Sequence, residues 1–163
     1  MLYLLFSLGT QRYAVPAKRV VEVLPLVEVR QIPRSPAGVA GLFNYRGQLV
    51  PLIDLCELVV GLPAIPWLST RILLVSDCGE KLYGLIVERA TRTREYDSGA
   101  FTPSGIVSGE APYLGSVAND AEGMLQCIEL DVLLSGQQMS RLFGPGAGTP
   151  TMGTEVAHAV RTH

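Results

Sequence analysis

Residues 41–55 of the chain read Gly41-Leu42-Phe43-Asn44-Tyr45-Arg46-Gly47-Gln48-Leu49-Val50-Pro51-Leu52-Ile53-Asp54-Leu55. Two short apolar runs lie on either side of Arg46-Gly47, and glycine has the backbone freedom that a tight reversal needs. The stretch closes on Asp54, a residue type whose side-chain oxygen caps the N-termini of helices. It therefore predicts a β-hairpin that leads directly into a short helix.

Arg46 is the unusual residue of this hairpin, because a guanidinium between two strands bound for the core cannot be buried alone. We expect it to be exposed or paired with an acidic side chain. Two interpretations stay open at this point: a solvated turn arginine and a functional arginine that faces a partner.

The run Asn44-Tyr45-Arg46-Gly47, followed by Val50-Pro51-Leu52-Ile53-Asp54-Leu55, resembles the signature of the CheW family, the small coupling proteins of bacterial chemotaxis. The usual form of that signature is N-L-R-G, then V-P, two aliphatic residues and D-L. Further similar positions extend the resemblance over roughly Leu4 to Leu142. They are Phe6-Ser7-Leu8-Gly9, Tyr13-Ala14-Val15-Pro16, Val20-Val21-Glu22-Val23, Ile32-Pro33, Pro36, Gly41, Gly84-Leu85-Ile86-Val87 and Tyr113-Leu114-Gly115.

The chain has 163 residues, of which 48% are hydrophobic and 17% are charged. This composition is typical of a well-packed globular protein. The net charge is −2, and no Lys/Arg run exceeds Lys18-Arg19, so nucleic acid is not an expected partner. The start lacks a basic leader, and no apolar run is long enough for a membrane-spanning helix. We expect a soluble, cytoplasmic protein without direct membrane insertion.

The chain has three cysteines, Cys56, Cys78 and Cys127, at wide spacing and without a C-x-x-C motif. This argues against a disulfide framework and against a zinc site. We interpret them as small core or surface residues, with a redox role as the alternative. No metal and no cofactor are expected.

The chain alternates short strand signals with turns, which favours an all-β barrel or sandwich with short helices. A helix is expected from Ala17 to Leu24, where apolar residues recur at helical spacing, and a half-exposed strand from Val27 to Ile32. The Pro-rich segment Leu62 to Ser69 is the candidate linker, and its Trp67 is either a hydrophobic pin or a ligand platform. The other expected strands are 3–8, 12–16, 71–76, 81–88, 90–95, 113–117 and 124–129, and the other expected helices are 36–38, 55–60, 130–134 and 137–143.

The resemblance implies two small five-stranded SH3-like barrels packed side by side, with short C-terminal helices. We expect one domain over residues 1–143, with subdomains of approximately 10–68 and 1–9 plus 69–143. Residues 144–163 lose the apolar periodicity, and this segment is expected to be a flexible tail.

Catalytic constellations are missing from the part of the sequence that is expected to fold. Both histidines, His158 and His163, fall in the expected tail, so a serine or cysteine nucleophile has no histidine base there. Four carboxylates, those of Glu22, Asp54, Glu57 and Glu88, leave a small hydrolase open as an alternative. We expect a protein that is not an enzyme.

The resemblance implies an adaptor that joins the cytoplasmic tip of a methyl-accepting chemoreceptor to the regulatory domain of a CheA-type histidine kinase. The receptor tip is expected in the groove between the barrels, and the kinase domain is expected against the end of one barrel. The alternative is a stand-alone SH3-like peptide-binding or regulatory module of a non-flagellar signalling pathway.

The positions that match receptor-facing sites of that family are Val20, Glu22, Arg46, Ile72, Gly84, Ala90 and Thr93. The kinase-facing candidates are Val23, Val39, Gly41 and Leu42. Arg46 and Glu22 are expected to form an ion pair at the rim of the groove, with a purely structural salt bridge as the alternative. Val20 and Ile72 fit either groove or core, because periodicity does not separate the two.

Three positions depart from the pattern of that family. Tyr45 stands where leucine is usual, and Ala90 and Thr93 replace larger aliphatic residues. The departures predict a shallower or more polar groove, and they leave the identity of the receptor open.

Overall fold

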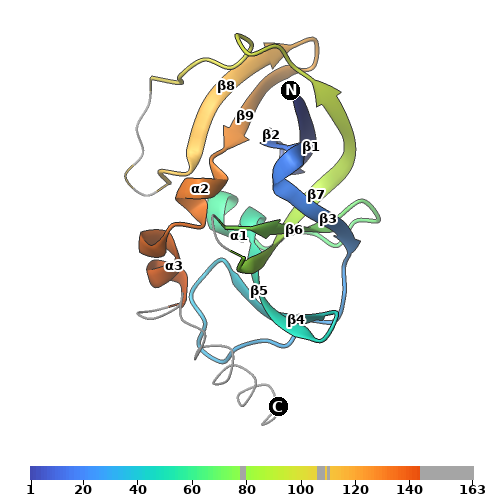
Figure 1. Ribbon diagram of the computed structural model, residues 1–163, viewed down its shortest axis with the longest axis vertical. Coiled ribbons are helices and arrows are strands. Elements are labelled where there is room, and N and C mark those ends of the chain that lie inside the picture. Colours follow the sequence, from blue (N-terminus) through green and yellow to red (C-terminus); the bar gives the residue numbers. More distant parts are fainter. Residues whose placement is uncertain (78–79, 106–108, 110, 144–163) are drawn as a thin grey trace.

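The structure, a computed structural model, describes residues 1–77, 80–105, 109 and 111–143. Cys78, the expected tail and both histidines therefore lie outside the described residues. The strands and α-helices, labelled in Figure 1, are β1 (Leu2–Leu8), β2 (Gln11–Pro16), β3 (Val20–Pro25), β4 (Val39–Tyr45), β5 (Gln48–Asp54), α1 (Leu55–Val60), β6 (Arg71–Ser76), β7 (Leu82–Glu95), β8 (Leu114–Asp120), β9 (Gly123–Ile128), α2 (Leu130–Leu133) and α3 (Gly136–Phe143). A 3-10 helix, η1 (Ala17–Arg19), lies between β2 and β3.

Strand β7 belongs to both halves of the molecule. Its first part pairs with β6 and β5, and its second part pairs with β1. The strands β3, β4, β5 and β6 and the first part of β7 form the lower barrel of Figure 1, whereas β1, β2, β8 and β9 and the second part of β7 form the upper barrel. The prediction of an all-β fold with short helices and two five-stranded units is confirmed.

The change of barrel within β7 occurs at an irregular point of the strand. Arg89 has a φ of 51°, and the pairing with β1 shifts between Leu5 and Ser7. Such irregularities bend a strand and redirect it. The sequence predicts two strands here, 81–88 and 90–95, and the structure shows one bent strand.

Two other predictions of secondary structure, for residues 17–24 and 27–32, are wrong. The expected helix 17–24 is wrong, because after η1 the chain forms β3, which pairs with β6 and alternates half-buried with exposed residues. Three of its residues are valines, which favour strands. The expected strand 27–32 is also wrong: only Arg30 makes an isolated bridge, to Leu42.

The predicted subdomain division is wrong for two strands. β2 pairs with β1 and β9 in the upper barrel, and β6 pairs with β3 in the lower barrel. The reason is that the chain passes between barrels after β2 and again at Arg89, and not at the Pro-rich segment.

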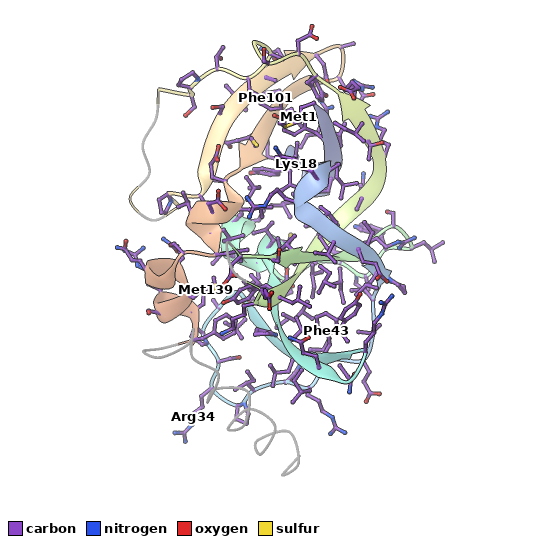
Figure 2. The ribbon with its side chains drawn as sticks, in the orientation of Figure 1. Met1, Lys18, Arg34, Phe43, Phe101 and Met139 are labelled. Atoms are coloured by element: carbon purple, nitrogen blue, oxygen red, sulfur yellow. The ribbon has the colours of Figure 1, made fainter. Side chains whose placement is uncertain are left out.

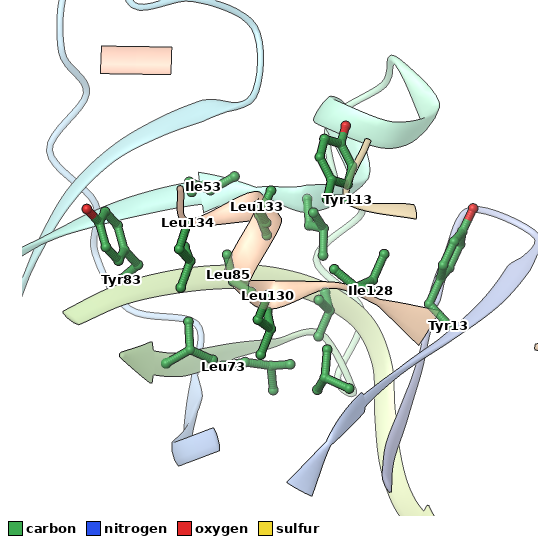
Figure 3. Close-up of a cluster of buried hydrophobic side chains, with 14 of the residues drawn as sticks. Tyr13, Ile53, Leu73, Tyr83, Leu85, Tyr113, Ile128, Leu130, Leu133 and Leu134 are labelled. Carbon is green, nitrogen blue, oxygen red and sulfur yellow. The ribbon is translucent and has the colours of Figure 1, made fainter. Parts of the chain in front are cut away.

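The largest apolar cluster lies between the barrels, where Leu4, Phe6 and Leu8 of β1 join residues of β5, β6 and β7 and of the helices. Figure 3 shows part of this cluster, with Ile53 of β5, Leu73 of β6, Leu85 of β7 and Leu130 of α2 labelled. Smaller clusters fill each barrel, with Phe43 in the lower one and Phe101 at the edge of the upper one (Figure 2). Because the outer face of β1 is part of the shared core, each barrel covers apolar surface of the other.

Two cysteines, Cys56 and Cys127, are buried and free, and burial raises the pKa of each thiol to about 11. This confirms the interpretation of these two as core residues.

Candidate functional site

The hairpin of β4 and β5 turns at Arg46 and Gly47, as the sequence predicts. Both residues have positive φ, 51° and 85°, which is the pattern of a two-residue turn whose twist matches that of the strands. The Asn44 side-chain oxygen accepts a hydrogen bond from the Gly47 amide at 2.8 Å. The turn therefore holds the Arg46 backbone in a defined position at the end of the lower barrel.

Arg46, Glu22 and Tyr45 form one cluster, which we call the Arg46 cluster. The Arg46 Nη2 lies 3.3 Å from the Glu22 Oε1, and the Tyr45 hydroxyl donates to the same oxygen at 2.8 Å. The Arg46 guanidinium also lies 5.2 Å from the centre of the Tyr45 ring. The predicted ion pair is therefore present, and Tyr45 takes part in it.

The cluster leaves most of the guanidinium in water, because the side chain of Arg46 is 75% exposed and that of Glu22 is 37% exposed. The hydrogen bond to Glu22 raises the pKa of the Tyr45 hydroxyl above its ordinary value. An ion pair this exposed contributes only about 0–1 kcal/mol to stability. Its main physical effect is to fix the direction of an available cation.

Ile72 and Gly84 lie inside the lower barrel. Ile72 is 0% exposed, so the choice between groove and core is settled in favour of core for this residue. A Cβ at Gly84 would lie 2.7 Å from a Phe43 ring carbon and 2.8 Å from a Leu52 methyl carbon. Gly84 is thus a packing position rather than a groove-lining one.

The remaining receptor-facing candidates lie on β3 and β7. Val20 is half-buried against the shared core, as is Ala90, whose amide donates to the Ser69 carbonyl at 3.1 Å. Thr93 is exposed opposite Leu4. Val21, the neighbour of Val20 on β3, is exposed.

The kinase-facing candidates also divide into buried and exposed residues. Val39 and Leu42 are buried, and Gly41, at a φ of 140°, packs so closely that a Cβ would overlap the Arg30 carbonyl oxygen. Only Val23 is exposed. Val39, Gly41 and Leu42 therefore support the fold and offer little side-chain surface to a partner.

Three of the four carboxylates considered for hydrolysis, those of Asp54, Glu57 and Glu88, accept hydrogen bonds from backbone amides. Asp54 accepts from the Glu57 amide at 3.1 Å, which confirms the predicted helix cap, and from the Ala64 amide at 2.9 Å. Glu57 accepts from the Gly38 amide, and Glu88 accepts from the amides of Gly9 and Ile65. Burial raises the pKa of the Asp54 carboxyl, and the amide hydrogen bonds oppose this shift.

Two further properties concern the described residues as a whole. They contain no group of three His, Cys, Asp or Glu side chains that is placed to hold a metal ion. None of the helices in this part of the chain has the length and apolar character needed to cross a membrane.

The upper barrel carries an arginine cluster that the sequence analysis missed. Arg12 donates to both oxygens of Asp120 at 2.8 and 2.9 Å, Arg94 reaches the same carboxylate at 3.1 Å, and Arg92 pairs with Glu122. The alternation of Arg92 and Arg94 within an expected strand was the available signal, because it places both on one face.

Comparison with known proteins identifies similar chains. Residues 2–138 match the family model described as CheW-like domain. The chain is 24% identical over 140 residues to the chemotaxis protein CheW of Klebsiella aerogenes, which covers 85% of this chain and 84% of that protein. It is 30% identical over 97 residues to the protein PilI of Pseudomonas aeruginosa, which covers 60% of this chain and 54% of that protein.

A solved structure is similar as well. The scaffolding protein TtCheW from Thermoanaerobacter tengcongensis superimposes with a TM-score of 0.74 at 25% identity, over 84% of this chain and 89% of that chain.

Proposed function

The chain belongs to the CheW-like domain family, and TtCheW, to which it is similar, is a scaffolding protein. From this premise we propose that the chain couples chemoreceptors to a CheA-type histidine kinase. The family and the similar chains support a CheW-like adaptor of chemotaxis signalling. Such an adaptor works by binding and not by turnover. We place it in the cytoplasm, at receptor arrays on the inner face of the membrane.

The Arg46 cluster is the observation on which this proposal depends. A cation that is fixed by its own turn, by Glu22 and by Tyr45, yet is 75% exposed, is suited to orient a charged partner. Since the cluster adds little to stability, its geometry is better explained by recognition than by folding.

We assign the receptor tip to the side chains of Arg46, Glu22 and Thr93 and to the half-buried Val20 and Ala90, the candidates that the resemblance gives. Ile72 and Gly84 act on these residues only through the packing of the lower barrel. For the kinase regulatory domain, Val23 is the candidate whose side chain is available, and Val39, Gly41 and Leu42 position the strand beneath.

The proposal is tested by titration calorimetry with two probes, a chemoreceptor tip fragment and the regulatory domain of a CheA-type kinase. Both are expected to bind the full chain at separate sites, so saturation with one leaves the other able to bind. The absence of binding to either probe overturns the proposal. Competition between the two probes contradicts the separate placement.

A further inference from the structure

The segment between α1 and β6 has a fixed backbone. Its Ala64 amide donates to Asp54 at 2.9 Å, and its Ile65 amide donates to Glu88 at 2.6 Å. The buried Thr70 hydroxyl donates to the Ile65 carbonyl at 2.6 Å and accepts from the Trp67 amide at 3.0 Å. Two buried carboxylates and one buried hydroxyl thus determine the course of this segment.

The same segment exposes its apolar side chains. Leu68 is 98% exposed, Trp67 is 43% exposed, and Leu62 and Ile65 are also exposed, as is Val60 at the end of α1. We call these five residues the apolar loop. Mobile loops can fold apolar groups inward, but here the hydrogen bonds of the backbone hold them outward. Exposed apolar side chains that lie this close along a chain with a fixed backbone indicate an interaction site.

Arg89 connects the apolar loop to the arginine cluster of the upper barrel. Its guanidinium lies 5.4 Å from the centre of the Trp67 ring. It also lines an open pocket of about 270 Å³ together with Arg12, Arg92 and Glu122. The backbone of Arg89 has a φ of 51°, which is unfavourable for a residue other than glycine.

The charge around this pocket is positive. Arg12, Arg89, Arg92 and Arg94 carry four positive charges, and Asp120 and Glu122 carry two negative charges, so the balance is +2. The chain as a whole carries −2. The cationic character is therefore local, and the ion pairs with the two carboxylates hold three of the four guanidinium groups in place.

We propose that the apolar loop and the arginine pocket form one docking surface for a protein segment that combines acidic and apolar side chains. The apolar residues of that segment pack on Trp67 and Leu68, and an acidic side chain enters the pocket beside Arg89 and Arg92. Charge complementarity selects the acidic partner, and the apolar loop favours a protein segment over a purely ionic ligand. The surface uses no residue of the Arg46 cluster.

The test starts with a display library of random 12-residue peptides selected on the full chain, and an enriched peptide is then synthesised for calorimetry. Enriched sequences are expected to place Asp or Glu within a few residues of Leu, Phe or Trp. Arg89→Gly and Leu68→Ser should each weaken binding at least tenfold. Glycine accepts the left-handed backbone at position 89, and the Leu68 side chain is almost fully in water, so both variants should fold.

Arg141→Gln, which changes an exposed arginine of α3, is the matched control and should bind as the unchanged protein does. Three results would overturn the proposal: no enrichment, enriched peptides without acidic residues, or full binding by both variants. If Arg46→Glu weakens peptide binding as much as Arg89→Gly, the peptide occupies the proposed receptor surface, and a separate docking surface is contradicted.

Discussion

The Tyr45 hydroxyl lies 2.8 Å from the Glu22 carboxylate oxygen, the same oxygen that faces Arg46. Tyr45 stands at a position where the family signature has leucine, which cannot make this bond. In this chain the phenol therefore adds a second donor to Glu22 and limits the directions that the Arg46 ion pair can take.

Replacing Tyr45 by phenylalanine removes this donor and keeps the ring beneath Arg46. We expect the free energy of unfolding to change by less than about 1 kcal/mol, because Glu22 is accessible to water. Affinity for the receptor tip should fall about three- to tenfold, since Glu22 is then less constrained. Calorimetric titration measures the affinity of the variant for the receptor tip and for the kinase regulatory domain. An unchanged affinity for the receptor tip would show that the phenol has no role in docking.

Asp120 is expected to make the upper barrel sensitive to acid. The hydrogen bonds from Arg12 hold the pKa of its carboxyl well below the usual range. A carboxyl with a lowered folded-state pKa contributes stability that is complete above its unfolded pKa of about 3.9 and is lost as the pH falls below it.

The variant Asp120→Asn tests whether the Asp120 carboxylate is the cause of this loss of stability at low pH. At pH 7 it should be about 2 kcal/mol less stable, because Arg12 and Arg94 lose their shared carboxylate. Its stability should also fall less between pH 5 and pH 2.5 than that of the unchanged protein. Urea unfolding across this range measures both effects, and parallel pH profiles for the two proteins contradict the assignment.

Gly84→Ala is expected to destabilise the lower barrel by about 1–3 kcal/mol, because the new methyl group overlaps Phe43 and Leu52 in a filled interior. Gly99→Ala is the matched control, since a Cβ there meets nothing within 4 Å. Chemical denaturation of both variants makes the comparison. Equal stabilities would mean that Gly84 is not a packing position, and its assignment to the receptor surface would have to be considered again.

Asp54→Ala should cost about 2 kcal/mol, because the amides of Glu57 and Ala64 lose their acceptor. Asp54→Asn retains a side-chain oxygen and should cost less than half as much. The urea midpoint measures both changes, and hydrogen exchange at Ala64 reports whether the apolar loop loosens. If the loop stays equally protected in Asp54→Ala, this carboxylate is not its anchor.

Local signals in the sequence identified the turn at Arg46-Gly47 and the cap at Asp54. In both cases the physical cause lies within a few residues, in the freedom of glycine and in the acceptor of a helix cap. The pairing of Arg46 with Glu22 was predicted from the resemblance. Tyr45, the third member of the Arg46 cluster, stood out only as a departure from the pattern of the family.

The errors have a common cause, which is that apolar periodicity does not tell which surface covers a residue. Val20 and Leu24 fit a helix equally well until β6 is seen to pair with them. Ile72 fits a groove or a core in the same way. The bend at Arg89 has no sequence signal of the kind that glycine would give, so the shared strand and the arginine pocket beside it could not be predicted.

The central claim is that Arg46 orients the receptor and takes no part in the kinase site. The variant Arg46→Glu tests this claim most directly. Calorimetric titration of this variant should show at least a tenfold loss of affinity for the receptor tip and kinase-domain affinity within a factor of two. Its melting temperature should fall by no more than about 4 °C, because the exposed ion pair contributes little to stability. Unchanged receptor affinity, or equal losses for both partners in a folded variant, would contradict the account.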